Sequence, residues 1–159
     1  MSYLLGIETA LPEYAINKTD FVRFVAEQSG ADENTLRKLR WLAEKSAIDN
    51  RYAALPDYQD AASARLYYRH GQVHRATVRE RMHLYAELAL DLSLRAAAPL
   101  VEQFGKPTHV VYTSCTGLSA PGLEMSLLGS LGLSPQTFRH TVNFMGCYAA
   151  VHALRTAHY

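Results

Sequence analysis

The sequence predicts an α/β fold, because segments with the composition of buried strands alternate with segments whose apolar residues recur at helical spacing. Residues 109–114 and 138–145 are rich in the Val, Thr, Tyr and Phe that pleated, largely buried strands favour. Residues 78–98 carry apolar side chains every three or four positions, which is the spacing of one helical face. The chain of 159 residues is long enough for one domain with its own core.

Composition argues against several classes of protein. A net charge of +1 is too small for bulk affinity for nucleic acid, which needs a concentrated basic face. There is no apolar run of 18 residues and no charged-then-apolar leader, so we expect a cytoplasmic protein without a membrane span. The two cysteines are too few for a disulfide framework or a zinc site, and His70 and His74 have no evident third ligand. No metal site is expected.

The beginning of the chain is predicted to form one strand and two helices. Residues 3–7 have the composition of a short buried strand. Asn17, with Asp20 three residues later, predicts the cap of a helix that stops at Gly30. A second helix is predicted over residues 32–46, where acidic residues at the start suit the helix dipole.

Periodicity is lost between residues 51 and 76, so we expect irregular chain there, with at most a short helix over residues 60–68. Thr77 and Glu80 then form a capping-box pattern that opens a long helix. Its predicted buried stripe consists of Val78, Met82, Tyr85, Ala89, Leu92 and Ala96. Pro99 is expected to kink or end this helix, because it cannot donate a hydrogen bond to the carbonyl four residues earlier.

The rest of the chain is predicted to alternate strands and helices. The strand over residues 109–114 leads through a Pro-Gly loop to a helix over residues 123–131. The strand over residues 138–145 leads directly into an Ala-rich helix over residues 148–158. Both strands are apolar enough to be buried on both faces of a sheet. Functional sites gather at the ends of such strands in α/β proteins.

Cys147 lies where the last strand meets the last helix, and this joint is the first candidate for a reactive site. Unpaired amides and the helix dipole at a helix N-terminus favour a thiolate, and the same amides can hold a developing oxyanion. Gly146 fits this interpretation, because the residue before a nucleophile on a tight turn has to leave room for the substrate. The alternative is a buried cysteine that fills space beside small alanine residues.

Short motifs over most of the chain resemble the N-terminal part of the type III polyketide synthases, the chalcone synthase-like enzymes. The resemblance rests on Phe144-Met145-Gly146-Cys147-Tyr148-Ala149-Ala150, on Thr113-Ser114-Cys115-Thr116-Gly117 and on Ala120-Pro121-Gly122. Further landmarks occur in the same order, at Thr9-Ala10-Leu11-Pro12, Glu44-Lys45-Ser46-Ala47-Ile48, Arg51-Tyr52, Glu80-Arg81-Met82 and Leu131-Gly132-Leu133. The resemblance implies an α/β, thiolase-like layered fold, of which residues 1–159 form only the N-terminal half.

The resemblance also implies an acyltransferase of polyketide biosynthesis. In that family the cysteine matching Cys147 accepts an acyl group from an acyl-CoA starter, and malonyl-CoA units are added by decarboxylative Claisen condensation. No cofactor is implied beyond these coenzyme A thioester substrates, and the full-length protein is expected to be a homodimer.

The acyl pocket is implied to include positions matching Cys115 and Ala120. Cys115 is either a packed strand residue or a pocket-lining thiol, and both descriptions can hold. The family residue matching Ala120 reaches across the dimer into the partner's cavity. Because both side chains are small, we favour a long fatty acyl starter over a coumaroyl one.

Lys38, Trp41 and Lys45 share one face of the helix predicted over residues 32–46. A cationic face with an aromatic side chain suits the phosphates and adenine of coenzyme A. The alternative is a solvated basic face with Trp41 turned into the core, which the residue types alone favour. The resemblance implies that Lys38 and Lys45 bind the phosphates, and it places Trp41 where the family has a third cation.

The family's activating His and Asn fall beyond Tyr159. His152, five residues after Cys147, is expected to point away from the thiol. We therefore expect this chain to be a fragment of a full enzyme and to be inactive alone. One alternative is a ketoacyl-acyl carrier protein synthase III-like enzyme, which shares the fold and the cysteine. Another is a non-catalytic, truncated acyl-binding or dimerisation module.

Overall fold

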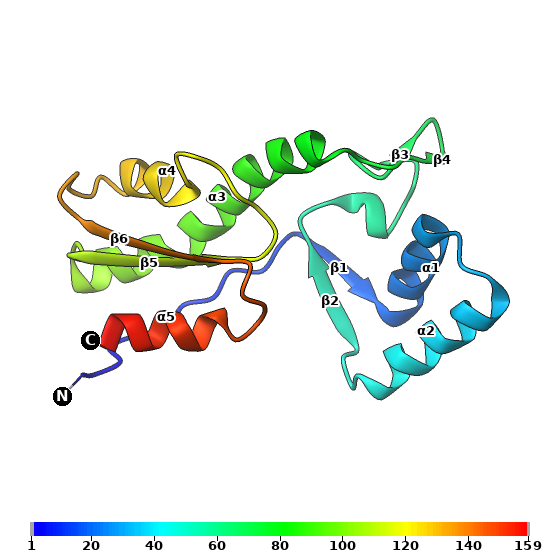
Figure 1. Cartoon of the computed structure of the whole chain (residues 1–159), viewed down its shortest axis with the longest axis horizontal. Helices are drawn as coiled ribbons and strands as arrows, with labels where there is room; N and C mark the ends of the chain where they lie inside the picture. Colours follow the sequence, from blue (N-terminus) through cyan, green and yellow to red (C-terminus); the bar gives the residue numbers. More distant parts are fainter. Residues whose placement is uncertain (1, 159) are drawn as a thin grey trace. The chain divides into compact units, whose positions relative to one another are not determined.

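The computed structural model describes residues 2–158. The chain forms two compact units, which are considered separately. Residues 11–81 make the first unit, and residues 2–10 together with residues 82–158 make the second unit. Figure 1 shows the elements of each unit in chain order, coloured from blue to red.

The first unit packs two helices beside a short antiparallel strand pair. Strand β1 (Tyr14–Asn17) pairs with β2 (Asn50–Ala53), and helices α1 (Lys18–Ser29) and α2 (Glu33–Lys45) connect them. The two strands were not predicted. Ile16, at 2% exposure, is the most buried apolar residue of this unit. The other buried apolar residues of the unit are Val22, Phe24, Ala43, Pro56, Leu66 and Tyr68.

Both helix predictions in the first unit are confirmed, together with the predicted cap and stop of the first helix. The Asn17 side-chain oxygen accepts a hydrogen bond from the Asp20 amide at 2.9 Å and starts α1. Gly30 ends α1 with φ at 63°, a left-handed conformation that glycine adopts without a steric cost. Asp32 starts α2 by accepting a hydrogen bond from the Thr35 amide at 2.7 Å.

The short helix predicted over residues 60–68 is wrong, because a buried carboxylate holds that backbone in another conformation. Asp57, only 2% exposed, lies in the 3-10 turn η1 (Pro56–Tyr58). Its carboxylate accepts hydrogen bonds from three consecutive amides, at 2.9, 2.8 and 2.5 Å. The donors are the amides of Arg65, Leu66 and Tyr67. Because these three amides donate to Asp57, they do not donate to the carbonyls four residues earlier, as they would in a helix. The chain continues instead into a small hairpin, β3 (Tyr68–Arg69) and β4 (Gln72–Val73).

Helix α3 (Val78–Phe104) begins with the predicted capping box, which is confirmed. The Thr77 amide donates to Glu80 Oε2 at 2.7 Å, and the Glu80 amide donates to Thr77 Oγ1 at 3.2 Å. Pro99 was expected to kink or end the helix, and it does not end it, since α3 continues to Phe104. The Gly105 amide still donates to the Val101 carbonyl at 2.9 Å, so helical hydrogen bonding resumes beyond the proline.

The predicted stripe of α3 is half-buried at Met82, Tyr85, Ala89, Leu92 and Ala96, but no residue of this helix is fully buried and Val78 is 63% exposed. A helix of 27 residues is about 40 Å long, whereas a six-residue strand spans only about 20 Å. The strand next to α3 is therefore too short to cover the whole stripe.

The second unit is built on a parallel strand pair. Strand β5 (His109–Ser114) pairs with β6 (Phe138–Asn143) through the crossover helix α4 (Leu123–Ser130), and α5 (Ala149–His158) follows β6. Figure 1 shows α5 on one side of the pair and α4 on the other. The buried apolar residues of the unit are Leu123, Leu127, Leu128, Leu133 and Ala149. These elements were all predicted, although β6 ends two residues early and α5 starts one residue late.

The strand predicted over residues 3–7 is wrong. Residues 3–7 are irregular chain, and Tyr3, Leu4 and Leu5 are 76%, 72% and 72% exposed. An extended segment becomes a strand only beside another strand, and the β5–β6 sheet of the described chain has no third strand.

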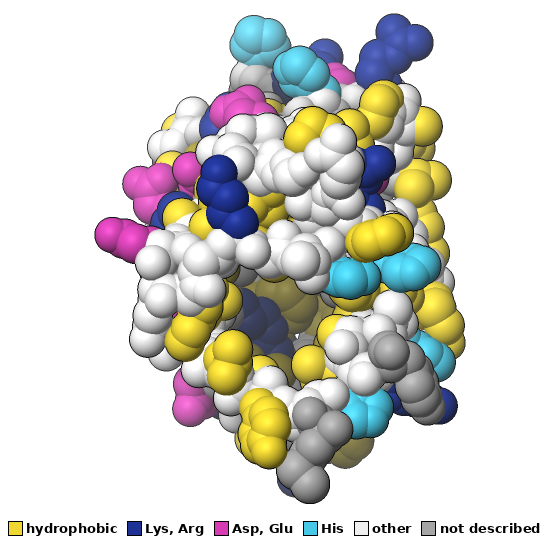
Figure 2. All heavy atoms as spheres, turned by 90° about the vertical axis from the view of Figure 1, so that its left-hand side faces the viewer, with side chains coloured by type: hydrophobic (Ala, Val, Ile, Leu, Met, Phe, Trp, Pro, Cys, Tyr) yellow, Lys and Arg dark blue, Asp and Glu magenta, His cyan; other side chains and the backbone are white. Residues whose placement is uncertain are grey.

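Strands β5 and β6, although apolar enough to be buried on both faces of a sheet, are not buried on both faces within this chain. Five residues of β5 are half-buried, and the first four residues of β6 are exposed. Large hydrophobic side chains lie open to solvent on this unit, including Phe138 at 68% and Leu154 at 67% exposure, and many such side chains are visible in Figure 2. Within residues 2–158, no helix combines the length and the apolar character that crossing a membrane requires.

Candidate functional site

The ends of β5 and β6 bring the two cysteines together. The ladder pairs Ser114 with Asn143, so the loops that follow these residues leave the same edge of the sheet. Cys115 directly follows β5 and Cys147 lies four residues after β6. The Cys115 thiol donates to the carbonyl oxygen of Gly146 across 3.6 Å. The structure thus places two residues that were singled out separately in one site.

The turn before Cys147 requires unusual backbone conformations. Phe144 has φ at 55° and Gly146 has φ at 78°, both in the left-handed region. The Phe144 amide donates to the Ser114 carbonyl at 3.1 Å, which anchors the turn to β5. A Cβ added to Gly146 would meet nothing closer than 3.7 Å, so there is room for a side chain within this chain. Glycine is favoured at this position because its φ is positive.

Cys147 is exposed and lies in the turn that leads into α5, two residues before the helix begins. The Ala149 amide donates to the Gly146 carbonyl at 3.0 Å, and the Val151 amide donates to the Tyr148 carbonyl at 2.9 Å. The thiol therefore lies at the N-terminal end of α5, as predicted, and it is not a buried space-filling residue. His152 instead packs its ring against Tyr148, with centroids 5.3 Å apart.

The loop after β5 carries both predicted pocket residues. Cys115 and Ala120 are exposed, whereas Gly117 between them is buried. A Cβ on Gly117 would overlap the ring of Tyr85, so this glycine allows the loop to approach α3 closely. The predicted pocket residues therefore lie on a loop that is fixed by packing at its centre.

A polar network below this loop was not found from the sequence. The Tyr85 hydroxyl donates to Ser114 Oγ at 2.7 Å and is bonded to the Tyr112 hydroxyl at 2.6 Å. Burial raises the pKa of Tyr112, and its hydrogen bond with Tyr85 raises it further. The only sequence signal is that Tyr112 and Ser114 alternate along β5 and so point to the same face.

In the first unit, Lys38, Trp41 and Lys45 all lie on the exposed surface of α2. Trp41 is 60% exposed, so the alternative in which it turns into the core is wrong. Neither lysine forms an ion pair with another residue in the described range 2–158. The face is therefore cationic, uncompensated and open.

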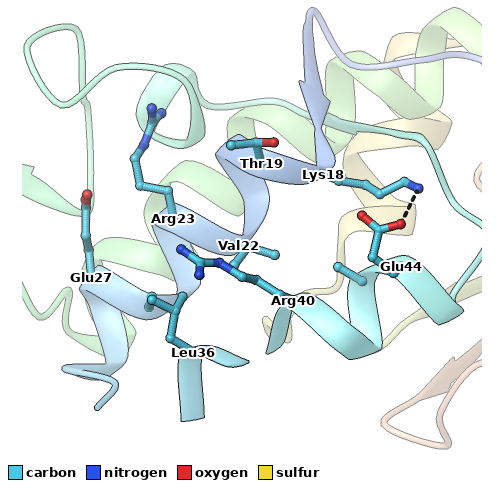
Figure 3. Close-up of a pocket in the computed structure, with 10 residues that line it drawn as sticks. Lys18, Thr19, Val22, Arg23, Glu27, Leu36, Arg40 and Glu44 are labelled. Atoms are coloured by element: carbon cyan, nitrogen blue, oxygen red, sulfur yellow. Dashed lines mark ion pairs between the residues drawn. The ribbon is translucent and has the colours of Figure 1, made fainter. Parts of the chain in front are cut away.

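The opposite face of α2 borders a groove of about 610 Å³ between α1 and α2 (Figure 3). Lys18 lies at its edge and points toward Glu44, with Nζ 3.6 Å from Glu44 Oε2 and 3.0 Å from Asp49 Oδ1. The bond to Asp49 is the main reason that the pKa of Lys18 is raised. Lys38, Trp41 and Lys45 are not among the lining residues, so α2 presents two separate surfaces.

No metal centre is evident in the part of the chain that the structure describes, where no three His, Cys, Asp or Glu side chains converge as metal ligands. His74, considered above as a ligand, lies with its Nε2 atom 3.3 Å from Glu80 Oε1.

Comparison with known proteins gives a consistent result. The family described as "Chalcone and stilbene synthases, N-terminal domain" matches residues 1–159. The "Alpha-pyrone synthesis polyketide synthase-like Pks18" of Mycobacterium tuberculosis is 36% identical over 159 residues, covering 96% of this chain and 38% of that protein. "Type III polyketide synthase 21" of Oryza sativa subsp. japonica is 29% identical over 162 residues, covering 97% of this chain and 40% of that protein.

Solved structures agree. The crystal structure of PKS-I from the brown alga Ectocarpus siliculosus superimposes with a TM-score of 0.81 at 27% identity, covering 96% of this chain and 42% of that one. CsyB complexed with CoA-SH gives a TM-score of 0.76 at 24% identity, covering 96% and 39%, a likeness of fold alone. The chain thus spans about two fifths of the length of these relatives.

Proposed function

The chain belongs to the chalcone and stilbene synthase family, whose N-terminal domain it matches, and we propose that the complete protein is a type III polyketide synthase with Cys147 as its nucleophile. The family resemblance noted in the sequence is confirmed. The fold is the N-terminal half of the thiolase-like α/β fold found in solved type III polyketide synthases. Because the chain covers 38% of Pks18, activity is proposed for the complete protein.

The observation that supports this proposal best is the position of the Cys147 thiol. It is exposed, it lies at the edge where both strands end, and it precedes the first amides of α5. The thiolate attacks the carbonyl of an acyl-CoA, a new thioester forms on Cys147, and the CoA thiolate leaves. The amides of Ala149 and Val151 already donate to carbonyl oxygens, so the oxyanion of the tetrahedral intermediate is stabilised by other backbone amides of this turn.

Extension of the acyl chain needs a second step. Loss of CO₂ from malonyl-CoA leaves an enolate, whose carbon attacks the Cys147 thioester and releases the thiol. A cysteine of this kind works with an imidazole that stabilises the thiolate. We propose that a histidine and an asparagine outside these 159 residues complete the site, so that this chain alone does not turn over substrate.

The exposed face of α2 is proposed as the coenzyme A contact. Lys38 and Lys45 have no competing ion pair in residues 2–158 and are free to bind phosphate. Trp41 lies between them at 60% exposure, available to stack on the adenine where the family resemblance places a third cation.

The proposals for the acyl pocket and the product class rest on the size of two side chains and on the similarity to Pks18. Cys115 and Ala120 present short side chains on the loop after β5, which leaves room for a long fatty acyl starter. Pks18 is named for α-pyrone synthesis, and we propose the same product class here. The complete protein is proposed to be a homodimer, in which Ala120 faces the partner's cavity.

The test is to map the acyl-enzyme. The complete protein is incubated with a long-chain acyl-CoA without malonyl-CoA, and the modified peptide is located by mass spectrometry. We expect the acyl mass on the Cys147 peptide, its loss in Cys147→Ala and its retention in Cys115→Ala. An adduct on Cys115, or none on Cys147 while malonyl-CoA is consumed, contradicts the proposal. Extension only with malonyl-acyl carrier protein indicates the ketoacyl synthase alternative.

A further inference from the structure

Two buried oxygen atoms near the strand ends have no hydrogen-bond partner in the described chain. They are Oε2 of Glu124, in the first turn of α4, and Oδ1 of Asn143, the last residue of β6. Both residues line one small cavity of about 10 Å³, together with Tyr85, Tyr112 and Gly117. The cavity lies within the second unit, beneath the loop that carries Cys115 and Ala120.

Both oxygen atoms are acceptors, so neither can satisfy the other. Buried acceptors are nearly always paired, because leaving one unpaired forfeits its hydration without replacement. The hydroxyl groups of Ser119 and Thr141 also line the cavity but form no hydrogen bond with either oxygen atom, and those of Tyr85 and Tyr112 are engaged with each other. Tyr85 donates its proton to Ser114 Oγ at 2.7 Å, which leaves Tyr112 as the donor of the 2.6 Å bond between the two tyrosines. The two oxygen atoms therefore need a hydrogen-bond donor that does not belong to the described chain.

We propose that one water molecule binds in this cavity and donates one hydrogen to Glu124 Oε2 and the other to Asn143 Oδ1. A water molecule has two O–H donors, which matches the two acceptors. A volume of about 10 Å³ is close to the minimum that admits one water, so larger ligands are excluded. The bound water joins α4 to the end of β6.

This bridge makes Glu124 and Asn143 positioning residues for the acyl site, an inference that rests on the proposed function. Glu124 follows the loop that carries Cys115 and Ala120, and Asn143 precedes the turn that leads to Cys147. The water therefore holds the two walls of the site at a fixed separation. Neither residue touches the reacting atoms.

The first test measures thermal stability and does not depend on catalysis. In the complete protein, Glu124→Met and Asn143→Leu each remove one acceptor and leave the other without its bridge, so each lowers the melting temperature. The double variant removes both acceptors and fills the cavity, so its loss is smaller than the sum of the two single losses. Ser126→Met, on the exposed side of the same helix, leaves the melting temperature unchanged. Additive losses overturn the bridge.

A high-resolution crystal structure of the complete protein gives a direct answer. An ordered water within about 3.2 Å of both oxygen atoms supports the proposal. Direct contact between the two oxygen atoms, with a shared proton and no water, overturns it.

The positioning role is read from the rate at which Cys147 is acylated. Glu124→Met slows acylation severalfold with a long-chain starter, and the double variant recovers much of the rate because it restores the packing between the two walls. Equal rates in the parent and in Glu124→Met overturn the positioning role. If the parent protein itself forms no acyl-enzyme, the proposed function is wrong. The melting temperatures of the two single variants and the double variant still decide whether a water molecule bridges Glu124 and Asn143.

Discussion

The Cys115 thiol donates a hydrogen bond to the carbonyl oxygen of Gly146 across 3.6 Å, linking residues 31 positions apart in the sequence. The contact joins the loop after β5 to the turn that presents Cys147. Both thiols are exposed. The Cys115 thiol is hydrogen-bonded to a carbonyl, and the Cys147 thiol lies before the first amides of α5. Two cysteines in one site therefore have different chemical surroundings.

We expect iodoacetamide at pH 7 to modify Cys147 several times faster than Cys115. The Cys147 thiol lies exposed at the start of α5, whereas the Cys115 thiol donates its proton to the Gly146 carbonyl. Peptide mapping over time on the protein gives both rates, and Cys115→Ala serves as the control that leaves a single reactive thiol. Equal rates, or faster labelling of Cys115, contradict the assignment of Cys147 as the activated thiol.

Reversing both charges on the α2 face is expected to weaken coenzyme A binding. Replacing Lys38 and Lys45 with Glu removes two charge-assisted phosphate contacts and adds repulsion, so the Kd at low salt should rise by about 100-fold. Calorimetric titration of the complete protein measures it. The matched control reverses Arg75 and Arg79, also exposed in the same unit, and should change the Kd much less. Unchanged affinity in the Lys38/Lys45 variant removes this face from the coenzyme A site.

Gly117→Ala is expected to lower the free energy of unfolding by about 1–3 kcal/mol, because the added methyl group overlaps the ring of Tyr85. Chemical denaturation measures the change, and adding Tyr85→Ala should cost less in the Gly117→Ala background than in the parent. Gly129→Ala is the control, since nothing lies within 4 Å of its added Cβ and alanine favours helix α4. A Gly117→Ala variant as stable as the parent shows that the loop does not depend on this close approach.

Phe144→Gly is expected to raise the free energy of unfolding by about 1 kcal/mol. A non-glycine residue at φ 55° carries a steric cost, and Phe144 is 59% exposed, so removing its ring loses little burial. Phe144→Ala keeps a Cβ and should therefore stay close to the parent. Denaturation midpoints distinguish the two variants, and a loss of stability in Phe144→Gly shows that the ring contributes more than the backbone costs.

Glu80 should contribute a pH-dependent part of the stability. The Thr77 amide, with help from the Thr77 hydroxyl, His74 and Arg69, holds the pKa of Glu80 at about 2, below its usual value of 4.5. The carboxylate therefore stabilises the folded state above about pH 4.5, and this contribution is lost as the pH falls toward 2. Glu80→Gln should accordingly destabilise at pH 7 and converge with the parent near pH 2.

Denaturation at several pH values checks this expectation, with Glu102→Gln on the exposed surface of the same helix as control. A Glu80→Gln effect that does not change between pH 7 and pH 2 indicates that the carboxylate acts only through its shape and not through its charge.

Several features could be predicted from the sequence because the interacting groups lie within a few residues of one another. Asn17 and Asp20, Asp32 and Thr35, and Thr77 and Glu80 form caps at a spacing of three residues. Strands β5 and β6 were predicted from the composition of their residues, α4 and α5 were predicted as the helices that follow them, and the motif around Cys147 indicated the family. In each case the sequence pattern and the structure that it predicts involve residues close together in the chain.

Tertiary structure decided the features that join distant segments. Asp57 keeps residues 65–67 out of a helix through bonds that span 8 to 10 positions, and residues 3–7 stay irregular because no described strand receives them. The same holds for the outward direction of Trp41, which depends on which face of α2 meets α1. The cavity shared by Glu124 and Asn143 exists only where α4 and β6 meet, and the bond from Cys115 to Gly146 exists only because two parallel strands end at the same edge. Side-chain type and spacing do not encode such distances, because they depend on how separate elements pack.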